Sequence, residues 1–248
     1  MSYMQDNPYQ ATYGSYAPMA DMAAEWERAA FIRRTYVHLG GAILAFAMIE
    51  TLIFSLVPME TLVRLSFGLA GPFGWLLFLG GFMVVSWVAR SWASSSTSVS
   101  TQYIGLALYV IAQAVLFVPL LTVAFVQVAD PRLIPSAGII TLIVFSGITL
   151  AAFVTKKDFS FLRMYLVWGG FIALGLIVCA AFFQGLSLGI WFSLAMVALA
   201  SGYILYDTSN VIHHYRTDQH VAASLALFAS VALLFWYVIR LLMQLNRR

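Results

Sequence analysis

Asp207 is the residue of this sequence best placed to do chemistry inside an apolar segment. If the segment is a helix, Tyr203 and Asn210 lie on the same helix face as Asp207. A charged carboxylate within a membrane helix costs at least ~2.5 kcal/mol, so such residues are uncommon without a role. Two interpretations stay open. Asp207 is a proton-sensitive latch or cation ligand, or it is a helix-end acid that reaches interfacial water.

Three further ionisable residues fall within or beside apolar segments: Glu50, Arg90 and Arg240. Glu50 is expected to line a cation path or to pair with Arg240 at a similar depth. The alternative is a structural ion pair or an acid whose side chain snorkels to the interface. Arg90 and Arg240 lie near predicted helix ends, where snorkelling explains a long cationic side chain.

His213, His214 and His220 cluster with Asp218 near the end of the chain. Imidazoles can bind zinc or sense pH between 5 and 8. However, an adjacent His-His pair and a distant third histidine do not match compact ligand spacing, which favours an ordinary polar loop. The single cysteine, Cys179, excludes an intrachain disulfide. No catalytic motif occurs, so we expect neither an enzyme nor a bound cofactor or metal.

The elements that must position these residues are apolar helices. Of all residues 62% are hydrophobic and only 9% are charged, too few charges for the surface of a water-soluble domain of 248 residues. Crossing a bilayer takes roughly 20 apolar residues as a helix. Seven stretches are long enough: about 35–57, 73–91, 102–126, 134–155, 161–184, 188–212 and 221–244. The sequence therefore predicts an all-α membrane protein, a seven-transmembrane-helix bundle.

The predicted domains are a disordered N-terminal tail over residues 1–30 and a transmembrane domain over residues 31–248. Residues 1–27 contain prolines and alternating small and polar residues without a helical face, as is typical of a solvated leader. Within the first helix, Gly41 and Ala45 form a small-xxx-small pattern that predicts close approach of another helix.

The distribution of basic residues predicts the orientation. With a cytoplasmic N-terminus, eight basic residues fall inside and five outside, and early loops usually dominate. The eight are Arg28, Arg33, Arg34, Arg90, Lys156, Lys157, Arg163 and Arg216. We therefore expect the N-terminus in the cytoplasm and the C-terminus outside. The formal net charge of +3 is scattered, which argues against a nucleic-acid partner.

Three motifs resemble the Bax-inhibitor-one family, also called the transmembrane Bax-inhibitor-motif family. The first is Gly202-Tyr203-Ile204-Leu205-Tyr206-Asp207-Thr208, followed by a last helix that ends Val238-Ile239-Arg240-Leu241-Leu242. The second is Thr155-Lys156-Lys157-Asp158-Phe159-Ser160-Phe161-Leu162, and the third is Phe31-Ile32-Arg33-Arg34-Thr35-Tyr36. The resemblance covers residues 31–245, and the combination of motifs is more specific than any one of them.

This resemblance implies a seven-helix bundle with the last helix central. It also implies a pH-sensitive calcium leak controlled by two aspartates at the cytosolic ends of the last two helices. Asp207 matches the first aspartate, whereas Ser230 stands at the position of the second. Arg90 matches an arginine at the inner end of the family's second helix. A gate here would therefore titrate as a single acid with a hydroxyl partner.

Ser230 and the residues that flank Asp207 are similar to the YccA-like bacterial branch of the family. That branch implies a second function, a membrane-embedded modulator of an FtsH-type AAA protease that would grip the N-terminal tail. The alternatives are thus a passive cation or proton-linked leak, with Asp207 and Ser230 at its gate, and an interaction protein. The expected surroundings are a lipid bilayer, with calcium or protons as partners, in a bacterial inner membrane.

Overall fold

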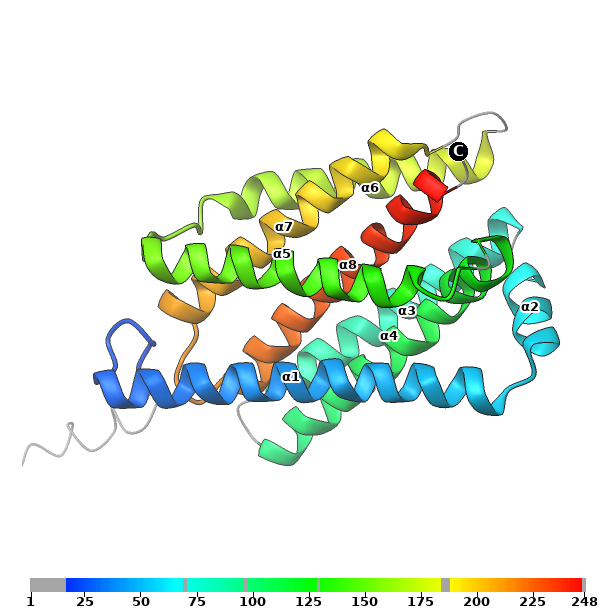
Figure 1. Cartoon of the computed structure of the whole chain (residues 1–248). Coiled ribbons are helices and arrows are strands. Elements are labelled where there is room, and N and C mark those ends of the chain that lie inside the picture. The colour runs from blue at the N-terminus through cyan, green and yellow to red at the C-terminus, as the bar shows by residue number, and fades with distance from the viewer. Residues whose placement is uncertain (1–16, 69–70, 96–97, 129, 184–187, 247–248) are drawn as a thin grey trace, which may run out of the picture.

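In the computed structural model, the described part of the chain forms eight helices (Figure 1). The described residues are 17–68, 71–95, 98–128, 130–183 and 188–246. The helices are α1 (Glu25–Leu56), α2 (Met59–Gly68), α3 (Pro72–Ala93), α4 (Val99–Val128), α5 (Leu133–Thr155), α6 (Leu162–Phe182), α7 (Ile190–His213) and α8 (His220–Asn246). All except α2 are long and apolar enough to cross a membrane. The predicted all-α membrane fold is confirmed.

Helix α8 occupies the centre of the bundle (Figure 1). Of the residues in its most apolar stretch, 61% are buried, whereas in the corresponding stretches of α3 and α6 only 11% are buried. It packs against α1, α3, α4, α5 and α7. Large side chains such as Phe228, Leu234 and Ile239 are buried along it. Because α8 contacts protein on most sides, its polar residues are held by neighbouring helices rather than by lipid.

The two ends of the bundle carry different connections. We call the end where α1 begins the N-terminal end; the α3–α4, α5–α6 and α7–α8 connections lie there too (Figure 1). The opposite C-terminal end holds α2 and the end of α8. Helix α2 lies between the first two predicted spans, where no helix was predicted. It is short and amphipathic and packs on α4, a long-range contact that local patterns do not reveal.

Residues 17–24 differ from the predicted disordered tail. The Ala20 N–H donates to the Tyr215 carbonyl (2.9 Å), and the Thr217 N–H donates to the Pro18 carbonyl (3.1 Å). The Thr217 hydroxyl also donates to Glu27 Oε1 (2.7 Å). This segment therefore straps the α7–α8 connection. Helix α1 begins at Glu25, ahead of the predicted domain boundary at residue 30, and residues 1–16 of the tail lie outside the described part.

Candidate functional site

Asp207 and Ser230 face each other from α7 and α8. Asp207 lies six residues before the end of α7, which places it ~9 Å from that helix end. The Ser230 hydroxyl donates a hydrogen bond to Asp207 Oδ2. Ser230 is buried, and α7 and α8 pack along much of their length. A polar link therefore joins the central helix to its neighbour within the apolar bundle; its role as a gate stays a prediction.

A cavity of about 650 Å³ begins beside this link. We call it the main cavity; it lies between α3, α4, α6, α7 and α8. Ser230 forms part of its wall, with Arg90 and Arg240 toward its opposite ends. Most of the remaining lining is aliphatic or aromatic, as with Phe82 and Trp236. A space of this size next to a carboxylate can admit water or a small ion only if the polar groups at its ends allow entry.

Both arginines of the main cavity have protein partners. Arg90 Nη2 donates to the Tyr109 hydroxyl (3.4 Å), and its guanidinium lies 5.3 Å from the centre of the Tyr109 ring. Arg240 Nη2 donates to the Leu188 carbonyl (3.3 Å). Arg90 lines the same cavity as Ser230, the hydrogen-bond partner of Asp207. The two arginines thus place positive charge toward both ends of the main cavity. This agrees with their side chains also snorkelling toward the interface.

The expected ion pair between Glu50 and Arg240 is wrong. Glu50 is buried in α1, only 7% exposed, and neither of its carboxylate oxygens has a hydrogen-bond partner among the described residues. Arg240 instead contacts the backbone at Leu188. Glu50 is also not among the residues that line the main cavity. The two residues lie at similar depths, but depth alone does not determine which helix faces meet.

Replacing Glu50 with leucine is expected to stabilise the folded protein by about 1–3 kcal/mol, because a buried carboxyl without a partner carries its full desolvation cost. Thermal unfolding in a neutral detergent measures the change. Glu60→Leu is the control, since Glu60 is exposed and its ion pair, with Arg64 at 3.4 Å, is exposed too; it should change stability by less than about 0.5 kcal/mol. A lower melting temperature for Glu50→Leu would contradict an unpartnered carboxyl.

The three histidines near the α7–α8 connection do not converge. His213 Nδ1 lies 3.0 Å from the Ser209 carbonyl, and His214 Nε2 lies 3.1 Å from Asp158 Oδ2. Asp218 pairs with Arg216 instead. No group of three metal-ligating side chains occurs in the described part of the chain.

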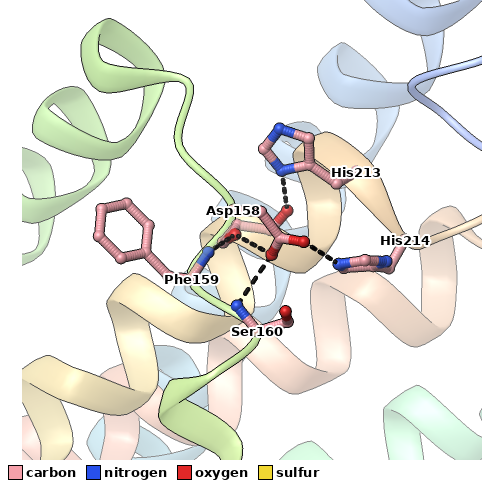
Figure 2. Close-up of polar contacts among 6 residues, drawn as sticks. Asp158, Phe159, Ser160, His213 and His214 are labelled. Carbon is pink, nitrogen blue, oxygen red and sulfur yellow. Dashed lines mark hydrogen bonds and ion pairs between the residues drawn. The ribbon is translucent and has the colours of Figure 1, made fainter.

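Asp158 anchors the α5–α6 loop to the end of α7 (Figure 2). Its Oδ1 accepts the Ser160 N–H (2.8 Å), and its Oδ2 contacts His214. The Phe159 N–H donates to the Ser209 hydroxyl (2.9 Å). Partial burial alone would raise the pKa of Asp158, but the hydrogen bonds from Ser160 and His214 outweigh it and hold that pKa below its usual range. The loop motif can be read from the sequence, but this contact depends on the meeting of two distant segments.

The Asp158 contact should persist from pH 8 down to pH 5. A carboxylate can only accept, so His214 Nε2 donates to it whether or not the imidazole is charged. Because the pKa of Asp158 is lower in the folded protein than its unfolded value of about 3.9, the ionised carboxylate stabilises the folded protein above that pH. This stabilisation is lost as the pH falls through the folded pKa. Hydrogen exchange of the Ser160 amide, corrected for intrinsic rates, should be constant over pH 5–8 and faster below about pH 4. The Asp158→Asn variant should lose this pH dependence. Faster exchange of the wild-type Ser160 amide near pH 6 would contradict the prediction.

A second polar chain at the N-terminal end connects α1, α4 and α8. His38 Nδ1 lies 2.7 Å from the Arg34 carbonyl, which can only accept, so this nitrogen carries a proton. In neutral His38, Nε2 then accepts from the Tyr103 hydroxyl (3.0 Å), whose oxygen lies 3.4 Å from His220 Nε2. His38 and Tyr103 carry no signal in the sequence, because they meet His220 through tertiary packing.

Comparison with known proteins agrees with this architecture. The profile of a family described as "Inhibitor of apoptosis-promoting Bax1" matches residues 28–247. An uncharacterized protein of Pseudomonas aeruginosa is 30% identical over 62% of this chain and 65% of its own length. For the BI1-like protein of Arabidopsis thaliana the identity is 32%, over 46% of each chain. Protein lifeguard 4 of Mus musculus is 27% identical over 57% of this chain and 59% of its own. Each match spans less than two thirds of the relative.

Proposed function

The chain belongs to the Bax inhibitor family, and on this premise we propose that it is a pH-linked cation leak through a bilayer. Calcium is the proposed ion, and Asp207 is the proposed gate acid with Ser230 as its partner. The mechanism involves passive movement of an ion and no chemical step. Membership of the family and seven apolar helices support a membrane-embedded role; the site supports the finer proposal.

The observation that carries this proposal is the hydrogen bond from Ser230 to Asp207. Ser230 belongs to the wall of the main cavity, and its bond ties the central helix α8 to α7. Opening this contact would remove a constraint between the two helices beside the wall of the main cavity.

The proposed pH dependence follows from the strength of this bond. A hydroxyl bound to an ionised carboxylate forms a charge-assisted hydrogen bond, roughly twice as strong as a neutral one. Proton uptake by Asp207 therefore weakens the link between α7 and α8. Because Ser230 has no second carboxyl to share the proton, one titration step is expected. Flux should rise as pH falls.

The proposed setting is a bacterial inner membrane, with the N-terminus in the cytoplasm and the C-terminus outside. In that orientation the N-terminal end of the bundle, with Lys156, Lys157 and Arg163, faces the cytoplasm, as the positive-inside rule favours. Asp207 would then respond to cytoplasmic pH, because it lies closer to that end.

Calcium flux into proteoliposomes, measured from pH 8 to pH 6, tests the proposal. The expected result is flux above that of empty liposomes, increasing toward pH 6. No flux from protein shown to be folded and inserted would overturn the leak. The alternative, a YccA-like modulator of an FtsH-type protease, would then apply. In that case, deletion of residues 1–16 should abolish the effect of this protein on the activity of the protease.

A further inference from the structure

We propose that a polar hollow between the start of α6 and the end of α7 binds a phosphate ester group. The hollow measures about 420 Å³ and lies at the N-terminal end of the bundle, apart from the main cavity. Its lining consists of Ser160, Arg163, Tyr206, Asn210, His214, Tyr215 and Gln219. The proposal does not depend on whether the protein conducts ions.

The lining of the hollow suits an anion rather than a cation. All seven lining side chains can donate a hydrogen bond, and none of them is a carboxylate. Arg163 supplies a guanidinium, whose planar donors match two phosphate oxygens at once. An apolar molecule would leave these donors unpaired, and a metal ion would find no carboxylate in the lining.

No acid among the described residues forms an ion pair with Arg163. The nearby Asp158 already accepts the Ser160 N–H and contacts His214, so both of its oxygens have partners. Its contacts hold the α5–α6 loop and the imidazole in place (Figure 2). The guanidinium therefore stays available for an added anion.

The position of Arg163 places the hollow where lipid headgroups lie. The side chains of Phe161, just before α6, and of Met164, Tyr165 and Trp168 on that helix are 60–70% exposed, as expected for side chains that face acyl chains. Lys156 and Lys157 lie exposed in the adjoining loop. Basic pockets between transmembrane helices near a membrane surface bind anionic headgroups. An anionic phospholipid and a soluble phosphate ester share the chemistry that this hollow recognises.

The test measures binding to delipidated protein in a neutral detergent. Native mass spectrometry gives the apparent Kd for phosphatidylglycerol and for phosphatidylcholine, and calorimetry gives that for glycerol 1-phosphate. Phosphatidylglycerol should bind more tightly to wild type than phosphatidylcholine does. Arg163→Gln should weaken that binding by about tenfold or more, because it removes charge-assisted hydrogen bonds. Arg163→Lys should retain part of the affinity.

Arg132→Gln is the matched control, since it removes the same charge from the exposed α4–α5 connection at the opposite end of the bundle. It should change the Kd less than twofold. If Arg163→Gln weakens the binding of phosphatidylglycerol but not that of glycerol 1-phosphate, the site recognises a lipid headgroup. If it weakens the binding of both, the site recognises phosphate esters in general. Equal effects of the Arg163 and Arg132 variants, with Arg163→Gln still folded by thermal unfolding, would overturn the proposal.

Discussion

Asp207→Asn is expected to raise calcium flux at pH 8 to about the wild-type level at pH 6 and to flatten the profile between them. Asparagine is neutral at every pH, so its bond with Ser230 has the strength of the protonated state. A charge-assisted hydrogen bond is worth about 1.5–3 kcal/mol. Losing half of this stabilisation of the closed state would increase the open fraction by roughly fourfold to tenfold. Flux into proteoliposomes, with calcium dye trapped inside, measures the change.

Two further variants test the partner of Asp207 and a carboxylate elsewhere. Ser230→Ala removes the donor, so flux should be high at pH 8 and nearly the same at pH 6, because the proposed pH dependence rests on this hydrogen bond. Asp158→Asn removes a carboxylate that contacts His214 outside the main cavity and should leave the flux profile unchanged. If Asp207→Asn has the wild-type profile, Asp207 is not the gate acid, whatever the absolute flux.

The helices were predictable because hydrophobic length is a local property. Each apolar run could be recognised without knowledge of its neighbours, and the seven predicted spans correspond to α1 and α3–α8. The strap of residues 17–24 was not predictable. Its backbone bonds to Tyr215 and Thr217 join segments almost 200 residues apart, and no local pattern in a small, polar segment indicates such a partner.

The site was predictable only in part, for a related reason. The link between Asp207 and Ser230 follows from matching positions in a known motif, and the structure forms that hydrogen bond. The pairing of Glu50 with Arg240 relied on depth in the membrane, which leaves the rotation of each helix undetermined. Contacts such as Asp158 with His214 require knowing which connections meet at one end of the bundle.

The predicted position of a close contact between helices differs from the position in the structure. The small-xxx-small pattern of Gly41 and Ala45 predicted a tight contact, but Gly41 is exposed, and a Cβ atom there would meet nothing within 4 Å. The tight contact lies instead at Gly105 in α4. A Cβ atom there would lie 2.6 Å from both the Ala89 carbonyl oxygen and the Ala93 nitrogen of α3.

Gly105→Ala is therefore expected to destabilise the protein by about 2–4 kcal/mol, at or above the usual cost of overpacking. Both clashing atoms belong to the α3 backbone, which cannot rotate away as a side chain would. The helices must separate instead. Gly41→Ala is the matched control and should be neutral or stabilising by up to ~1 kcal/mol, because alanine favours the helix. Thermal unfolding in detergent compares the two variants directly.

Gly105→Ala should also alter the lining of the main cavity. Arg90 lies on α3 between the two backbone atoms that approach Gly105, and its guanidinium contacts Tyr109 on α4. Moving α3 away from α4 would lengthen this contact and shift a cation that lines the main cavity. In protein that still inserts, Gly105→Ala should therefore change calcium flux, whereas Gly41→Ala should not. Equal melting temperatures for the two variants would mean that α3 and α4 are not in backbone contact at Gly105, and the arrangement of Arg90 over Tyr109 would lose its structural basis.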